Sequence, residues 1–262
     1  GKCNHWRSER IMPMYGNALI KNLKEGKHVY GFSVNFPEPA VIECVTAGWD
    51  YVWLDAQHGL MDYKDLLNCS IAARAAGVST IIRVPGHDFS VLGPVADLCP
   101  QGLMVPMVNN KEEAEKVARN LSFPPKGNRS FWNTRMIELV GDDYYKVKTT
   151  LIIAQIETKE GVENAEEIIG TEGIDVLMYG PADMGLSYGV EPGQRKKYAF
   201  MQEAAEKVIR CAKKAGKYSM FIAGDVAEAR ELEEMGADII VCGSDYGFLK
   251  EKSSRLIKEL KM

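Results

Sequence analysis

Eight short apolar segments that alternate with helical patterns predict an α/β fold, a (β/α)8 TIM barrel, as a single domain over residues 1–262. A barrel of this kind needs about 250 residues, and the chain has 262. The alternative is a doubly wound open sheet, but the GxGxxG sequence that usually follows its first strand is absent. No change in composition marks a linker between domains.

The expected strands are short apolar runs bounded by glycine, proline or charge, which is typical of buried parallel strands. They are residues 29–34, 50–55, 79–84, 102–105, 151–157, a sixth within 174–183, 218–223 and 237–242. The expected helices carry apolar residues on one face, and several end at a glycine. They are residues 17–23, 38–47, 63–76, 91–98 (with a weak pattern), 111–121, 159–171, 197–215, 226–235 and 244–260.

Two segments lack either pattern. Residues 1–15 are polar and are expected to be irregular, and residues 122–149 form an irregular insertion of a length that is often functional or interfacial. Ser244 is a suitable N-cap for the last helix.

The composition narrows the classes of function. A net charge of −4 and a pI near 5.7 provide no basic field for nucleic acid. Six cysteines without a CxxC pair favour free thiols in a reducing compartment. No apolar run approaches the roughly 20 residues that cross a bilayer, and the N-terminus lacks the apolar core of a signal peptide. We therefore expect a cytoplasmic protein that binds neither nucleic acid nor membrane.

The fifth and sixth expected strands each lead to a carboxylate. A right-handed crossover through residues 159–171 would place these strands side by side, so Glu157 and Asp183 would meet at their carboxyl ends, where α/β enzymes bind ligands. Two acids held together need a cation or must share a proton. Because only oxygen ligands are available, the metal is expected to be a hard divalent ion such as Mg²⁺ or Mn²⁺. Gln155 lies on the same strand face as Glu157 and is a candidate to orient a water or the substrate.

A structural role is the alternative for these three side chains. Glu157 would then cap the following helix, Asp183 would pair with a buried arginine, and Gln155 would bond to backbone.

Other polar residues follow neighbouring strands. Asp55 and His58 follow the second strand, and a carboxylate bonded to the imidazole would make His58 a proton shuttle near neutral pH. Arg83 ends the third strand, where it either pairs with a buried acid or binds an anionic substrate. In the turn at residues 180–187, the backbone N–H groups of Ala182 and Asp183 are candidates to hold a carboxylate or phosphate; a tight turn that simply requires glycine is the alternative.

These segments, in this order, resemble the HpcH/HpaI family of metal-dependent class II pyruvate aldolases, typified by 4-hydroxy-2-oxoheptanedioate aldolase. The resemblance covers residues 28 to 245 and rests on the runs VWLDAQHG (52–59), IRVP (82–85), GLMVPMV (102–108), FPPKGNRS (123–130), QIET (155–158) and YGPAD (179–183). It implies a TIM barrel and a homohexamer in which neighbouring subunits exchange the last helix. It also implies a lyase that cleaves 4-hydroxy-2-oxo acids reversibly to pyruvate and an aldehyde through a metal-stabilised pyruvate enolate.

The resemblance also assigns roles to residues. Glu157 and Asp183 would bind the divalent ion (Mg²⁺ or Mn²⁺, with Co²⁺ also suitable), and the amides of Ala182 and Asp183 would hold the pyruvate carboxylate. Arg83 would stabilise the enolate oxygen, and Gln155 would lie beside metal and substrate. His58, paired with Asp55, would move protons through a metal-bound water.

Some positions depart from the pattern of the family. Many relatives have glutamate where this chain has Gln57, and some have proline where it has Val84. The bulky run at residues 131–133 either narrows the pocket or packs in the core. A polar turn at His87 and Asp88 is a candidate to act on the aldehyde specificity of a neighbouring subunit.

Two other functions remain open on the sequence. One is a citrate or malyl-CoA type of lyase, which needs a basic groove for the coenzyme that the sequence does not reveal. The other is a non-catalytic barrel that binds a carboxylate.

Overall fold

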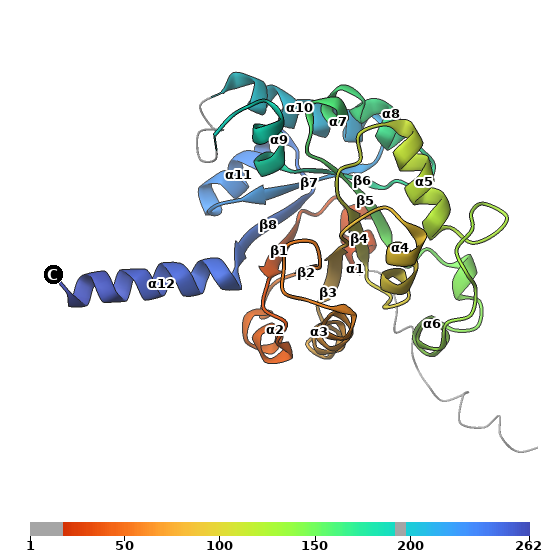
Figure 1. The fold of residues 1–262 in the computed structure, drawn as a ribbon, viewed down its shortest axis with the longest axis horizontal. Coiled ribbons are helices and arrows are strands. Elements are labelled where there is room, and N and C mark those ends of the chain that lie inside the picture. Colours follow the sequence, from red (N-terminus) through yellow and green to blue (C-terminus); the bar gives the residue numbers. More distant parts are fainter. Residues whose placement is uncertain (1–17, 192–197) are drawn as a thin grey trace, which may run out of the picture.

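The computed structural model describes residues 18–191 and 198–262, and its centre is a closed barrel of eight parallel strands (Figure 1). The strands are β1 (Val29–Val34), β2 (Tyr51–Asp55), β3 (Ser79–Arg83), β4 (Gly102–Val105), β5 (Leu151–Ile156), β6 (Val176–Tyr179), β7 (Tyr218–Ala223) and β8 (Ile239–Ser244). Each strand pairs with the next one in the chain, and β8 pairs with β1 to close the barrel. The predicted TIM barrel is therefore confirmed.

Helices surround the barrel (Figure 1). They are α1 (Ala18–Lys24), α2 (Pro39–Val45), α3 (Tyr63–Ala75), α4 (Phe89–Ala96), α5 (Lys111–Leu121), α6 (Thr134–Val140), α7 (Lys159–Glu163), α8 (Ala165–Gly170), α9 (Pro181–Ser187), α10 (Ala199–Lys214), α11 (Val226–Met235) and α12 (Asp245–Leu260), with a 3-10 turn at Tyr144–Lys146. Local signals account for several helix ends. For example, Asp62 and Asp65 form a reciprocal capping box at the start of α3, and Gly216 follows α10 with a φ of 65°.

The barrel interior is filled by alternate residues of the strands. One apolar cluster joins Tyr51, Trp53, Ile81 and Ile153 with other strand residues, and α1 contributes its buried leucines to the same cluster. Because side chains alternate along a strand, Asp55, Arg83 and Gln155 continue this interior-facing series at the carboxyl ends. The alternation thus directs these polar groups toward the barrel mouth.

Three predicted elements differ from the structure. The insertion at 122–149 is not wholly irregular, because Asn133 caps the helix α6 and a 3-10 turn follows. The single helix expected at 159–171 is two helices that meet at Asn164, whose ψ of 7° interrupts the helical backbone. The segment from Pro181 forms a short helix, α9, in place of the expected turn. Residues 1–15, and the first positions of the helices expected at 17–23 and 197–215, lie outside the described residues.

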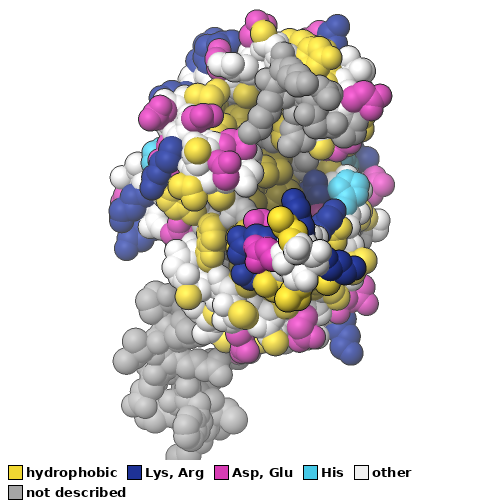
Figure 2. Space-filling model, turned by 90° about the vertical axis from the view of Figure 1, so that its left-hand side faces the viewer, with side chains coloured by type: hydrophobic (Ala, Val, Ile, Leu, Met, Phe, Trp, Pro, Cys, Tyr) yellow, Lys and Arg dark blue, Asp and Glu magenta, His cyan; other side chains and the backbone are white. Residues whose placement is uncertain are grey.

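The last helix, α12, projects from the barrel (Figure 1). Ser244 caps it as predicted, and the buried carboxylate of Asp245 accepts the backbone N–H groups of Asn35, Phe36 and Tyr246. Beyond this first turn, several large apolar side chains are exposed: Phe248, Leu249, Leu256, Ile257 and Leu260. Figure 2, which views the side toward which α12 projects, shows hydrophobic side chains among charged ones.

Within residues 18–191 and 198–262, no helix has both the length and the apolar character needed to cross a membrane.

Candidate active site

A buried ion pair lies at the ends of β2 and β3. Asp55 and Arg83 are direct partners in the register of these strands, and two hydrogen bonds join them, from Nε to Oδ1 at 2.9 Å and from Nη2 to Oδ2 at 2.5 Å. Burial raises the pKa of the Asp55 carboxyl, but the hydrogen bond and charge of Arg83 outweigh burial, so that the pKa is lowered overall. The Trp53 ring lies 4.8 Å from the guanidinium carbon and supports it from the barrel interior. Of the two roles predicted for Arg83, pairing with a buried acid is therefore present.

The predicted bond between Asp55 and the His58 imidazole is wrong for this structure. The carboxylate of Asp55 accepts the backbone N–H groups of Gln57 and His58, at 3.0 and 3.3 Å, in addition to Arg83. An aspartate readily accepts backbone N–H groups two and three residues ahead, so the D-x-x-H spacing forms a local turn. The His58 side chain is exposed on this turn at the mouth.

Glu157 follows β5 and is almost completely buried, with 1% of its surface exposed. Its carboxylate accepts the backbone N–H of Met107 at 2.8 Å and the side-chain amide of Gln155 at 2.6 Å. Burial raises the pKa of Glu157 to about 7, and the charge of Asp183 together with a hydrogen bond to it adds to the rise, while the Met107 N–H and Arg83 act in the opposite direction. The two acids predicted to meet at the mouth are therefore close enough to interact.

Two backbone features make room for Glu157. Met107 has a φ of 54°, which is rare for a residue with a side chain, and this conformation turns its N–H toward the carboxylate. Gly180, just after β6, leaves no space for a side chain, because an added Cβ would lie 2.7 Å from the Glu157 Cβ and 2.9 Å from the Gln155 Nε2. The end of β6 therefore forms a wall that only glycine can provide.

The residues at the mouth suit a hard divalent ion. Glu157 and Asp183 supply carboxylate oxygens, and the buried Oε1 of Gln155 has no hydrogen-bond partner among the described residues. A buried unpaired acceptor is costly, and a cation or a water bound to one would satisfy it. The described part of the chain holds no group of three or more His, Cys, Asp or Glu side chains that could bind a metal. The oxygen donors of Glu157, Asp183 and Gln155 are not the nitrogen and sulfur ligands that zinc prefers. Mg²⁺, in contrast, is commonly held by one or two carboxylates, with water and substrate completing its shell.

The structure thus gathers most of the predicted residues. Asp55, Arg83 and Glu157 form an electrostatically linked group at the mouth, with Gln155 and Asp183 beside Glu157. The bulky run at 131–133 packs locally instead: Phe131 stacks on Tyr144 at 5.4 Å, and the Trp132 N–H donates to the Tyr144 hydroxyl.

Sequence reasoning missed the contributions of Trp53, Met107 and Gly180. For Trp53, a signal was available: it lies two residues before Asp55, on the same face of β2. The hydrogen bond from the Met107 N–H to Glu157 depends on a positive φ, which cannot be predicted from a methionine in the sequence.

Buried charges concentrated at the carboxyl end of a β/α barrel are characteristic of TIM-barrel enzymes, and the chain is an enzyme of this class. Residues 31–251 match the family described as HpcH/HpaI aldolase/citrate lyase, and the chain belongs to this family. The chain is accordingly a lyase.

The relatives agree in sequence and in fold. A 5-keto-4-deoxy-D-glucarate aldolase from Shigella boydii serotype 18 is 29% identical over 219 residues, which are 82% of this chain and 84% of that protein. An HpcH/HpaI aldolase/citrate lyase family protein from Burkholderia cenocepacia J2315 has a crystal structure that superimposes with a TM-score of 0.87 at 26% identity, covering 94% of this chain and 100% of that one. The citrate lyase beta subunit from M. tuberculosis, solved with oxaloacetate and magnesium, is similar in fold alone, with 17% identity, a TM-score of 0.57, and coverage of 84% and 93%.

Proposed function

We propose that the chain is a divalent-metal-dependent class II aldolase that reversibly cleaves 4-hydroxy-2-oxo acids to pyruvate and an aldehyde. The observation that carries this proposal is the buried carboxylate of Glu157, held beside Asp183 and the amide oxygen of Gln155, which has no partner in the part of the chain that the structure describes. The name of the Shigella relative, an aldolase, supports the reaction class.

Glu157 and Asp183 would hold the divalent ion, Mg²⁺ or Mn²⁺. When bound, the ion would supply Lewis-acid stabilisation of the negative charge that develops on the 2-oxo group. It would also compensate the like charges of the two carboxylates, which otherwise raise the pKa of Glu157. The citrate lyase beta subunit was solved in complex with magnesium, which is consistent with this choice of ion.

Arg83 is proposed to stabilise the charge on the 2-oxo oxygen as the carbon–carbon bond breaks. A guanidinium has five N–H donors, and the pair with Asp55 uses Nε and one N–H of Nη2. The remaining N–H groups would donate hydrogen bonds to a substrate without breaking the ion pair with Asp55. Because the guanidinium is already fixed by Asp55 and Trp53, little reorganisation is needed during the reaction.

The substrate carboxylate is proposed to bind at the backbone N–H groups of Ala182 and Asp183, with the Gln155 amide beside it. These N–H groups belong to the first turn of α9, where a helix has no internal acceptors for them. Binding there would place the 2-oxo group near Glu157.

His58 is proposed to accept the proton of the C4 hydroxyl in cleavage and to return it in the aldol direction. Imidazole is the side chain most often used for general acid–base catalysis, and the exposed side chain of His58 can exchange protons with solvent. Asp55 acts on it through the backbone only, by fixing the turn that carries it.

The proposed assembly is a homohexamer in which α12 packs on a neighbouring subunit. The support is the row of exposed apolar side chains on α12, which a partner would cover. Sedimentation of the wild type and of Leu249→Glu/Ile257→Glu tests it: a hexamer that dissociates in the variant is expected, and a monomeric wild type would exclude it.

The experiment that tests the reaction is loss of the pyruvate methyl proton signal in D₂O with enzyme and Mg²⁺. Exchange reports enolate formation without requiring the correct aldehyde. We expect metal-dependent exchange that EDTA or Glu157→Ala abolishes, whereas Glu163→Ala, an exposed glutamate after the same strand, retains it. A wild type that catalyses no exchange with Mg²⁺, Mn²⁺ or Co²⁺ would contradict the aldolase proposal and leave a CoA-thioester lyase or a carboxylate-binding role.

A further inference from the structure

The FPPKGNRS run, which the proposed reaction does not use, folds into a turn beside a cavity of about 460 Å³. The turn closes on the end of α5, because the Asn128 N–H donates to the Arg119 carbonyl and the Arg129 N–H donates to the Ser122 carbonyl. Gly127 permits this closure, since an added Cβ would lie 2.2 Å from the Arg119 oxygen. The turn thereby carries Arg129 into the wall of the cavity.

Arg129 is buried, with 7% of its surface exposed. One Nη donates to Asp97 at 2.8 Å, and the Phe123 ring lies 4.7 Å from the guanidinium carbon. Its Nε–H, however, has no acceptor among the described residues. A buried donor of a charged group is costly to leave unpaired, so Arg129 brings a positive charge with unused hydrogen-bonding capacity to the wall of the cavity.

Among the described residues, the charged side chains that line the cavity are all basic. They are Lys126, Lys146, Lys148 and Arg129. The lysines pair with Glu172, Asp143 and Asp175 outside the lining. The pairs of Lys126 and Lys146 are exposed on both sides and contribute little, so these ammonium groups can turn to a ligand at small cost, whereas Asp175, the partner of Lys148, is mostly buried.

The remaining wall is apolar and partly aromatic. The lining includes Phe123, Tyr144 and Tyr145, whose rings contact one another edge to face. Arg129 lies over the Phe123 ring and Phe131 stacks on the buried Tyr144 ring, so the exposed Tyr145 ring is the aromatic surface that could accept a flat apolar body. The volume lies within the range of small-molecule sites, about 300–1,000 Å³. Thr150, which directly precedes β5, also lines the cavity, so it lies toward the strand starts and away from the mouth.

We infer that this cavity is a second ligand site, which binds a small organic phosphate with a flat apolar body. The lysines and Arg129 would bind the phosphate dianion, and the aromatic wall would bind the rest of the ligand. The site is independent of the proposed aldolase reaction and uses none of its residues.

Calorimetric titration of phenyl phosphate into the Mg²⁺-loaded full chain, with pyruvate present, tests the inference. We expect saturable binding with a Kd below about 1 mM, and a weakening of roughly 10-fold or more in Lys146→Ala/Lys148→Ala from the loss of two charged contacts. Both lysines are exposed, so this variant should fold. Arg129→Lys, checked by its melting curve, should also weaken binding because it lacks the Nε donor.

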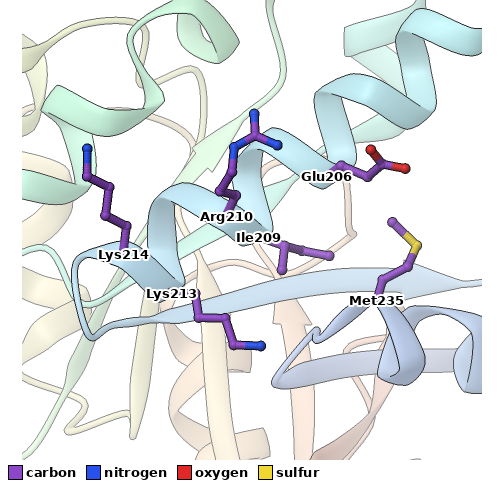
Figure 3. A pocket seen from close by; sticks show the side chains of 6 residues that line it. All are labelled: Glu206, Ile209, Arg210, Lys213, Lys214 and Met235. Carbon is purple, nitrogen blue, oxygen red and sulfur yellow. The ribbon is translucent and has the colours of Figure 1, made fainter.

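Lys213→Ala is the matched control. Lys213 lines a larger, open groove between α10 and α11 with Arg210 and Lys214 (Figure 3), so this variant removes a lysine from another basic cavity. It should leave the affinity unchanged. An absence of saturable binding, an affinity unaffected by the double substitution, an equal loss in the control, or tighter binding of benzoate than of phenyl phosphate would each overturn the inference.

Discussion

Arg83 and Asp55 stand directly opposite each other on β3 and β2 and are joined by two hydrogen bonds, of 2.9 and 2.5 Å. Both side chains are buried, and their geometry is the forked contact that only arginine provides. The pair fixes the direction of the guanidinium at the mouth, and it makes each partner necessary to the other because a lone charge would remain buried.

Arg83→Lys should therefore reduce kcat by roughly 10²-fold or more while the barrel remains folded, since lysine keeps the charge but loses the fork. Steady-state kinetics and thermal melting of the variant measure the two effects. Arg74→Lys, at an exposed position in α3, is the matched control. A kcat equal to that of the wild type would show that the fork is not needed.

The raised pKa of Glu157 predicts how stability depends on pH without metal. The pKa is about 7 in the folded chain and 4.5 as the ordinary value, so the folded state favours the protonated form. This contribution is fully present below the unfolded value and is lost as the pH rises through 7. It amounts to a few kcal/mol, at about 1.4 kcal/mol per unit of pKa.

Urea unfolding in EDTA at about pH 5 and pH 8 measures this change. Glu157→Gln should remove most of the difference, and Glu163→Gln should not. Asp55 has a lowered pKa, and its stabilising effect is lost only as the pH falls below its ordinary value, outside this range. The same proton on Glu157 competes with the metal, so the affinity for Mg²⁺ should increase with pH.

His58→Gln should separate catalysis from stability. The side chain is exposed, so the free energy of unfolding should change by less than about 0.5 kcal/mol. Loss of a general acid–base should lower the rate of aldol cleavage by roughly 10²- to 10⁴-fold. His28→Gln provides the comparison, because His28 is exposed just before β1, at the opposite end of the barrel from the mouth, and its ring nitrogen contacts the Ala237 carbonyl. Unchanged cleavage in His58→Gln would assign proton transfer to another group.

Gly180→Ala should disturb the mouth through a contact and not through backbone strain. The φ of Gly180 is −97°, which alanine adopts readily, but the added Cβ would lie 2.7 Å from the Glu157 Cβ. Overpacking of this kind costs about 1–3 kcal/mol, and displacement of Glu157 should weaken Mg²⁺ binding. Gly86→Ala, where nothing lies within 4 Å of the added Cβ, is the control for both measurements.

The barrel could be predicted from sequence because its signals are local and repeated. Apolar runs end at Gly, Pro or charge, and period-two alternation places Asp55, Arg83 and Gln155 on the interior-facing series. The proximity of Glu157 and Asp183 could be predicted because the right-handed crossover through residues 159–171 places the fifth and sixth strands side by side.

The details of pairing could not be predicted in this way. Whether Asp55 binds Arg83 or the His58 ring depends on side-chain directions across two strands, which spacing does not determine. The insertion was expected to be irregular because α6 has only seven residues, too few for a clear period. Met107 is the extreme case, since its contact with Glu157 depends on a backbone angle alone.

The buried carboxylate of Asp245 fastens the first turn of α12 to Asn35 and Phe36, on the loop that follows β1. Phe248 packs on the Phe32 ring at 5.2 Å, whereas Leu256, Ile257 and Leu260 farther along are exposed, so the contacts that hold α12 to the barrel lie near its start. The direction of α12 is therefore set by contacts within one subunit, and these contacts couple the start of the helix to the loop that follows β1 at the mouth.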